Sequence, residues 1–278
     1  MPWTERQHVL LRGLGLRLWS APAALPAATT TVSADEPAAP PAPVAGTPAP
    51  AAAAPGVRTV AVPGSAASGI VAPAARPRAE LAALDWPDLL AAVAACRACA
   101  LSEGRTQTVF GVGHPQAQWL LVGEAPGEQE DLQGEPFVGA AGQLLDRMLA
   151  ALGLTRGDDG PEPPAQRVYI ANTLKCRPPR NRNPAPDEMA KCEPFLLRQI
   201  ELLQPRLILA MGRFAVQSLL RSDEPIGKLR GRVHRYQGRP LVVTYHPAYL
   251  LRSPADKARA WEDLCLAARV FEQAAAAP

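Results

Sequence analysis

The cysteines are the first residues in this sequence whose type and spacing could carry chemistry. The chain has five, and two of them form a Cys96-x2-Cys99 pair. The apolar residues near the N-terminus are interrupted by Arg12 and Arg17, which does not fit a signal peptide, so we expect a cytoplasmic protein with reduced thiols. An odd number of reduced cysteines favours metal ligands over disulfides, and thiolates suit either zinc or an iron–sulfur cluster.

Three polar segments form a second group of candidate functional residues. Each follows a run of strand-like residues, and they are Gly123-Glu-Ala-Pro-Gly127, Asn172-Thr-Leu-Lys-Cys176 and His246-Pro-Ala-Tyr249. Glycine allows a ligand to approach the backbone closely, asparagine offers both an amide donor and a carbonyl acceptor, and histidine can stabilise a developing anion. Because parallel sheets bind ligands at the carboxyl ends of their strands, we expect these segments to form one site.

The elements that must position these residues alternate between apolar strands and amphipathic helices. We expect strands at residues 119–122, 168–174, 207–211 and 241–245, and helices at 81–95, 140–152, 186–203, 212–220 and 255–274. This alternation predicts an α/β fold with three layers (αβα) and a four-stranded parallel central sheet that is covered on both faces.

The N-terminal part of the sequence differs in composition from the rest. Many of the chain's 31 prolines fall within residues 21–78, which have almost no large apolar residues and cannot form a packed core. We therefore expect a disordered Ala/Pro-rich linker over residues 21–78 and a single folded domain over residues 79–278. Apolar residues at helical spacing within residues 4–19 predict a short helix in residues 1–20 that either docks a protein partner or folds back onto the folded domain.

Charge is divided unevenly along the expected folded domain. Residues 79–162 contain 4 basic and 13 acidic side chains, whereas residues 163–278 contain 19 basic and 10 acidic ones. Basic loops are often merely solvated, but clusters beside the polar segments favour binding of a phosphate backbone. The two clusters are Lys175, Arg177, Arg180 and Arg182, and then Lys228, Arg230, Arg232, Arg235 and Arg239. Because no run of about 18 apolar residues is present, we expect no membrane span.

Four longer stretches contain or extend the polar segments. They are Gly-Glu-Ala-Pro-Gly-Glu-Gln-Glu-Asp at 123–131, Glu-Pro-Phe-Val-Gly-Ala-Ala-Gly at 135–142, Asn-Thr-Leu-Lys-Cys-Arg-Pro-Pro at 172–179 and His-Pro-Ala-Tyr-Leu-Leu-Arg at 246–252. In order and spacing they resemble the signature of the family 4 uracil-DNA glycosylases. The resemblance implies that family's fold and an enzyme that hydrolyses the N-glycosidic bond of deoxyuridine in DNA, releasing uracil, leaving an abasic site and initiating base excision repair.

The resemblance also implies a role for each aromatic or amide residue of the site. Phe137 would stack on the flipped base, although a lone phenylalanine is more often a core residue. Asn172 would pair with N3–H and O4 of uracil, where an ordinary asparagine would cap a turn. His246 would donate a hydrogen bond to O2 and stabilise the departing uracil anion.

The loop at residues 123–127 is the part of the site whose chemistry the resemblance leaves open. Relatives use this loop to place the attacking water and to hold phosphate and sugar, which makes Gly123, Glu124 and Gly127 site residues. Ala125 stands where other glycosylases carry an aspartate, so Glu124 is either the general base or the group that orients the water. The open position at Gly127 also suits other deaminated bases such as hypoxanthine, and a DNA-binding module without activity is a further alternative.

The resemblance further implies that four of the cysteines hold a [4Fe–4S] cluster with a structural role. Zinc remains the alternative from the residues alone, because it also accepts four thiolates. Cys265 lies among apolar residues of the last expected helix and is expected to be a buried packing residue. We expect a monomer that binds uracil-containing DNA, single- or double-stranded. The four implied ligands are Cys96, Cys99, Cys176 and Cys192.

Overall fold

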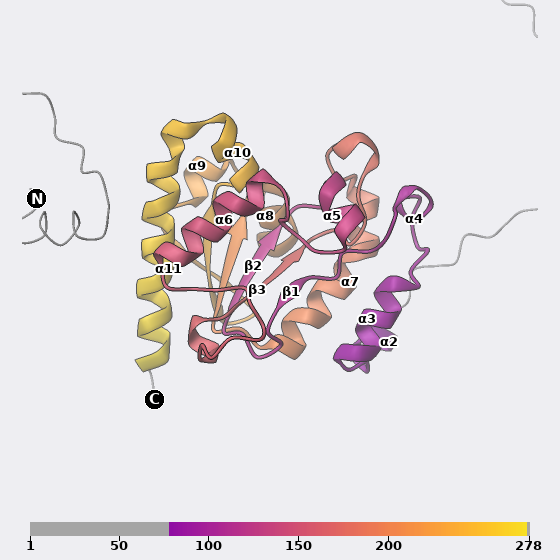
Figure 1. Ribbon diagram of the computed structural model, residues 1–278, viewed down its shortest axis with the longest axis horizontal. Helices are drawn as coiled ribbons and strands as arrows, with labels where there is room; N and C mark the ends of the chain where they lie inside the picture. Colours follow the sequence, from indigo (N-terminus) through magenta and orange to yellow (C-terminus); the bar gives the residue numbers. More distant parts are fainter. Residues whose placement is uncertain (1–77, 277–278) are drawn as a thin grey trace, which may run out of the picture. The chain divides into compact units, whose positions relative to one another are not determined.

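A central six-stranded sheet organises the computed structural model, which describes residues 78–276 (Figure 1). Across the sheet the strand order is β1-β3-β2-β4-β6-β5. Strands β3, β2, β4 and β6 are parallel to one another, whereas β1 and β5 are antiparallel to their neighbours. The predicted four-stranded parallel sheet is confirmed as the centre of a larger sheet. The strands are β1 (Val112–Gly113), β2 (Trp119–Gly123), β3 (Val168–Asn172), β4 (Leu207–Met211), β5 (Val233–Tyr236) and β6 (Arg239–Thr244).

The two edge strands are absent from the sequence prediction, and their composition explains why. β1 has only two residues, and β5 alternates between exposed and half-buried positions. By contrast, β2, β3 and β4 consist of buried residues throughout, because helices cover both faces of the sheet. A search for apolar runs finds strands of the second kind and misses short, half-exposed ones.

Helices cover both faces of the sheet, which confirms the expected three layers (Figure 1). On one face, α7 and α8 pack on the strands, and Leu196 of α7 shares a core with Leu120. On the other face, α6 and α11 contribute Leu145 and Leu264 to a core that includes Leu121. The helices are α2 (Arg78–Ala82), α3 (Trp86–Ala94), α4 (Leu101–Gly104), α5 (Glu128–Gln133), α6 (Ala140–Ala151), α7 (Pro186–Leu203), α8 (Arg213–Leu220), α9 (Ile226–Leu229), α10 (Pro247–Arg252) and α11 (Lys257–Ala276), with 3-10 turns η1 (Pro164–Gln166), η2 (Pro179–Asn181) and η3 (Pro254–Asp256).

The helix predicted over residues 81–95 is divided at Asp85 into α2 and α3. The Asp85 side chain accepts a hydrogen bond from the backbone N–H of Asp88 at 2.9 Å, which caps the start of a new helix. Leu89 of α3 then packs in a separate apolar cluster with Phe195 of α7. This packing fixes the end of α3, directly before Cys96, against the rest of the domain.

The pairing of the central strands brings the polar segments to one edge of the sheet. Gly123 at the end of β2 is paired with Asn172 at the end of β3. Met211 at the end of β4 is paired with Thr244 of β6, two residues before His246. The three polar segments therefore leave the sheet at the same edge, as the sequence predicts.

The sequence also predicts a docking helix and a linker in the N-terminal residues. The docking helix within residues 1–20 and the linker over 21–78 lie outside the described residues, apart from position 78. Within residues 78–276, no helix is long and apolar enough to span a membrane.

Candidate active site

A cavity of about 760 Å³ lies where the polar segments meet. Gly123 lies beside it, and a Cβ atom at this position would overlap the side-chain oxygen of Asn172 and lie 2.7 Å from the Phe137 ring. Glycine at 123 is therefore what allows these two side chains to approach the strand end. The structure thus brings together all the predicted residues of this site, and those lining the cavity are Glu124, Gly127, Phe137, Asn172 and His246.

Asn172 presents a buried amide to the cavity. The residue is 3% exposed, and its backbone carbonyl oxygen accepts a hydrogen bond from the Lys175 ammonium group at 2.9 Å. Lys175 is itself buried and donates a second hydrogen bond to Gln199 at 2.6 Å, so the backbone at Asn172 is held firmly. Within the described part of the chain, the Asn172 side-chain amide has no protein partner. An amide without a protein partner at a cavity wall is able to pair with a ligand.

Phe137 is held in a strained backbone conformation beside His246. Its φ of 57° lies in the left-handed region, which bulky side chains rarely adopt. Arg156 donates to the carbonyl oxygens of Phe137 at 2.8 Å and Pro136 at 2.9 Å. Gly142 lies so close to the Phe137 carbonyl that any Cβ there would overlap it. The phenyl and imidazole ring centroids are 5.3 Å apart. The strained backbone of Phe137 therefore lies at the cavity wall, beside His246.

His246 is the N-cap residue of α10, and this role determines its protonation. Its Nδ1 atom accepts a hydrogen bond from the backbone N–H of Ala248 at 3.2 Å, so the proton of the neutral ring is on Nε2. Removal from bulk water, assisted by the positive charge of Arg252, lowers the pKa of His246 to about 4. The site therefore contains a neutral imidazole whose Nε2–H can donate to a ligand.

Glu124 is the acidic member of the site and lies near two arginines. Burial raises the pKa of the Glu124 carboxyl, and the charges of Arg213 and Arg252 oppose this rise. The Glu124 carbonyl oxygen accepts hydrogen bonds from the backbone N–H of Leu174 at 3.1 Å and from the Thr173 hydroxyl. The loop after β2 is thereby tied to the loop that begins at Asn172.

Glu130 of α5 joins the two loops that border the cavity, and sequence reasoning does not identify it. Its carboxylate accepts hydrogen bonds from the backbone N–H of Gly127 at 3.1 Å and of Val138 at 3.2 Å. A Cβ at Gly127 would lie 2.6 Å from this carboxylate, so glycine there makes room for Glu130 as well as for a ligand. The only sequence signal is an acidic residue three positions after Gly127, which is typical of helix capping.

A second, smaller cavity contains the cysteines. Arg105 donates to the Cys176 sulfur at 2.9 Å, and the backbone N–H of Lys175 donates to the Cys192 sulfur at 3.2 Å. Burial raises the pKa of the Cys192 thiol to about 12, so a thiolate at this position would need a compensating positive charge, such as a metal ion or cluster. Cys265 lies in α11, outside this cavity, and is half-buried instead of buried as expected. The cysteines that line the cavity are Cys96, Cys99, Cys176 and Cys192.

The structure removes two residues from the basic clusters that the sequence predicts to bind phosphate, and leaves most of the others exposed. Lys175 is buried and bonded internally. Arg230 is also largely internal, because its side chain is 14% exposed and pairs with Glu262 and Asp263. Arg182 lines the active-site cavity, and its guanidinium group pairs with the Glu188 carboxylate at 2.5 and 2.9 Å while its side chain stays 46% exposed. Some of these basic residues form internal contacts and others line the cavity, and their spacing in the sequence does not show which do which.

Comparison with known families defines the class of protein. The family model described as "Uracil DNA glycosylase superfamily" matches residues 110–265, which is more than half of the chain and includes all three polar segments. The chain belongs to this superfamily.

Individual relatives define the group within the superfamily. The chain is 43% identical to the type-4 uracil-DNA glycosylase of Archaeoglobus fulgidus, over 60% of this chain and 83% of that protein. It is 42% identical to the type-4 uracil-DNA glycosylase of Thermotoga maritima, over 59% of this chain and 82% of that protein. A type-5 uracil-DNA glycosylase of Pyrobaculum aerophilum is 32% identical, over 50% of this chain and 64% of that protein. The chain belongs to the type-4 uracil-DNA glycosylases, and is thus a DNA glycosylase that hydrolyses N-glycosyl bonds.

Proposed function

We propose that this enzyme hydrolyses the N-glycosidic bond of deoxyuridine in DNA, releases uracil and leaves an abasic site. The observation that carries this proposal is that a neutral His246 and the unpartnered amide of Asn172 line one cavity. Uracil presents an acceptor, a donor and an acceptor at O2, N3–H and O4. The imidazole Nε2–H matches O2, the Asn172 carbonyl matches N3–H, and its amide N–H matches O4. Cytosine has an amino group in place of O4, so the same amide rejects it.

Phe137 supplies the third contact with the base. Its ring lies beside the His246 ring, and the backbone contacts of Arg156 hold it at the cavity. A base taken out of the DNA stack loses its neighbours, and stacking on an aromatic side chain compensates part of this loss. Rigid placement of the ring lowers the entropy cost of binding.

The chemical step requires charge stabilisation on both sides of the breaking bond. As the C1′–N1 bond breaks, the electron pair moves to the uracil ring and the sugar becomes positively charged. The hydrogen bond from His246 to O2 strengthens as this anion forms. The Glu124 carboxylate stabilises the sugar cation and orients the water molecule that adds to C1′, and the proton that this water loses ends on the released uracil. Arg213 and Arg252, which oppose the rise in its pKa, favour the carboxylate form.

The cavity of the four cysteines fits a [4Fe–4S] cluster better than a zinc ion. All four thiols line one cavity, yet among residues 78–276 no three Cys, His, Asp or Glu side chains are placed to hold a single ion. A cluster of four irons accepts thiolates that are farther apart than one tetrahedral zinc allows. When bound, the cluster would join α3, the loop after β3, and α7 covalently. Arg105 and the Lys175 backbone would stabilise its thiolates.

An excision assay tests the proposed function directly. The protein is incubated with oligonucleotides that contain uracil, hypoxanthine or a thymine mismatch, and alkali then cleaves the DNA at abasic sites. We expect cleavage at uracil and none at thymine, whereas cleavage at hypoxanthine would reveal the wider range that Gly127 permits. Absence of cleavage at uracil by protein with its iron bound would contradict the proposal.

The position of the site supports the proposed division into domains. All proposed site residues lie beyond residue 95, so residues 79–278 would be sufficient as the glycosylase domain. Deletion of residues 1–77 should leave uracil release from short oligonucleotides unchanged. Loss of activity, with iron content unchanged, would assign residues before 78 to the catalytic domain.

A further inference from the structure

A pair of stacked tyrosines forms part of the active-site wall next to His246. The ring centroids of Tyr245 and Tyr249 are 5.1 Å apart with an interplanar angle of 27°, and both residues line the cavity. Tyr249 is 36% exposed. None of the roles assigned to Phe137, Asn172 or His246 uses these rings, so an open aromatic surface remains beside the base pocket.

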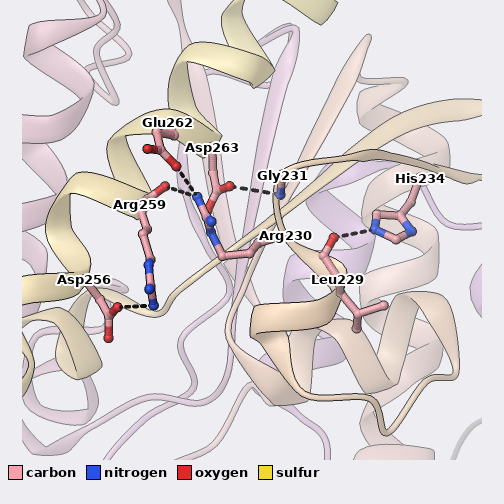
Figure 2. A network of polar contacts seen from close by, with 8 residues as sticks. All are labelled: Leu229, Arg230, Gly231, His234, Asp256, Arg259, Glu262 and Asp263. Atoms are coloured by element: carbon pink, nitrogen blue, oxygen red, sulfur yellow. Dashed lines mark hydrogen bonds and ion pairs between the residues drawn. The ribbon is translucent and has the colours of Figure 1, made fainter.

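A closed ring of contacts holds the tyrosine pair in place. The Tyr249 hydroxyl donates to Asp256 at 2.7 Å, and Asp256 accepts in turn from Arg259 at 3.0 Å. Arg230 donates to the carbonyl of Arg259 at 2.6 Å, and its guanidinium carbon lies 6.0 Å from the centre of the Tyr245 ring. The contacts thus run from Tyr249 to Tyr245, and the stacking of the two rings closes the ring of contacts. Figure 2 shows the polar part of this ring, from Arg230 to Asp256.

Acidic residues of α11 anchor Arg230 (Figure 2). Its guanidinium group pairs with Glu262 and Asp263, each at 3.0 Å. Asp263 is fully buried and also accepts a hydrogen bond from the backbone N–H of Gly231 at 3.1 Å. Breaking this pair would leave an unpaired buried charge, which is strongly unfavourable. The tyrosines therefore have a fixed geometry before any ligand binds, and such preorganisation lowers the entropy cost of binding.

Positive charge accompanies the aromatic surface. Arg213 and Arg252 line the same cavity, and Arg252 follows Tyr249 by three residues in α10. Aromatic rings flanked by arginines are the arrangement that binds single-stranded nucleic acid, in which bases stack on the rings and guanidinium groups contact phosphates. A chain of DNA that places one nucleotide against His246 must continue past this surface.

We propose that Tyr245 and Tyr249 form a stacking platform for the base next to the extruded uridine. Tyr249 supplies the exposed ring, Tyr245 supports it, and Arg252 contacts the phosphate that joins the two nucleotides. This inference rests on the proposed function and adds a subsite to it. Because every base has an aromatic face, the platform contributes to affinity for the strand and not to sequence preference.

Variants of Tyr249 test the platform in the full-length protein. Tyr249→Ala removes the ring, Tyr249→Phe keeps the ring but loses the bond to Asp256, and Trp261→Ala removes an exposed ring outside the cavity. The substrates are single-stranded oligonucleotides with one uridine, whose neighbouring nucleotides carry either normal bases or none. With normal bases, Tyr249→Ala should raise KM by about 5- to 100-fold, the scale of one lost base-stacking contact. Without neighbouring bases its KM should equal that of the wild type.

Trp261→Ala should retain the wild-type KM on both substrates, whereas Tyr249→Phe, which keeps the ring but loses the bond to Asp256, should raise the KM with normal bases by less than Tyr249→Ala does. A loss of the same size on both substrates for Tyr249→Ala would indicate a purely structural role and overturn the platform, and an unchanged KM on both would also overturn it. Failure of the proposed function would be seen separately, because the wild-type protein would then release no uracil from the normal oligonucleotide.

Fluorescence provides a readout that does not depend on turnover. 2-Aminopurine is placed next to a uridine whose 2′-fluoro group resists cleavage, and stacking quenches its emission. We expect quenching on binding to the wild type and to Tyr249→Phe, and little with Tyr249→Ala at saturating protein. Full quenching with Tyr249→Ala would place the neighbouring base elsewhere and overturn the proposal.

Discussion

The Nδ1 atom of His246 accepts a hydrogen bond from the backbone N–H of Ala248 at 3.2 Å. This contact caps α10 and leaves the proton of the neutral ring on Nε2. Because the pKa of His246 is lowered to about 4, the ring is neutral at physiological pH. In the proposed mechanism it would therefore meet the departing base as a hydrogen-bond donor and not as a cation.

His246→Ala should lower the single-turnover rate of uracil excision by about 10²-fold or more, the scale for one preorganised donor to a developing anion. Nitrogen NMR of the wild type should find Nδ1 unprotonated near neutral pH. His114→Ala is the matched control, because its Nδ1 accepts a similar hydrogen bond from the backbone of Gln116 at 3.0 Å, before β2 and outside the cavity. Near-normal excision by a folded His246→Ala protein would contradict the assigned role.

Asn172→Asp should abolish most uracil excision, because a carboxylate oxygen would replace the amide donor that faces O4. Binding of free uracil, measured by calorimetry, should weaken in parallel. Gln116→Glu makes the same chemical change at an exposed turn and should leave both quantities unchanged. Wild-type rates for Asn172→Asp would show that another group reads the base.

The acid limb of the pH–rate profile should report Glu124. Burial raises its pKa, so activity that needs the carboxylate is present above that pKa and is lost as the pH falls through it. Arg213→Gln removes a charge that opposes the rise, so the limb should move to higher pH. His246, with a pKa of about 4, remains neutral over the limb. Glu124→Gln should lower the rate and remove the acid limb. An acid limb that stays at the same pH in Arg213→Gln would show that a group other than Glu124 causes it.

Purified protein should be brown, absorb broadly near 400 nm and contain about four irons per chain. Substituting any of the proposed ligands by serine, for example Cys192→Ser, should remove this absorbance and lower the melting temperature. Cys265→Ser is the control, because this cysteine lies outside the cavity and should leave iron content unchanged. Zinc without iron in protein purified anaerobically would refute the cluster assignment.

The sequence predicts the centre of the fold because the central strands are short runs of apolar residues. Buried parallel strands also imply where their loops converge, which places Asn172 and His246 correctly without any contact information. Residues that act across loops are not predictable in this way. Glu130 binds the backbone of two loops, and Arg156 supports Phe137 from 19 residues away. Charged residues have no periodic spacing, so the sequence does not distinguish charged residues on the surface from those whose side chains bind the backbone of another loop.

The contact between Gly142 and the Phe137 carbonyl limits how this protein can vary. Even an alanine methyl group at 142 would overlap that oxygen. Gly153 differs, because a Cβ there meets no atom within 4 Å and only the φ of 71° must be tolerated, which asparagine can do. In a library that randomises every position, selection for activity would return glycine alone at 142 but both glycine and asparagine at 153. Tolerance to mutation would thus distinguish a glycine required by a neighbouring atom from one required by its own backbone.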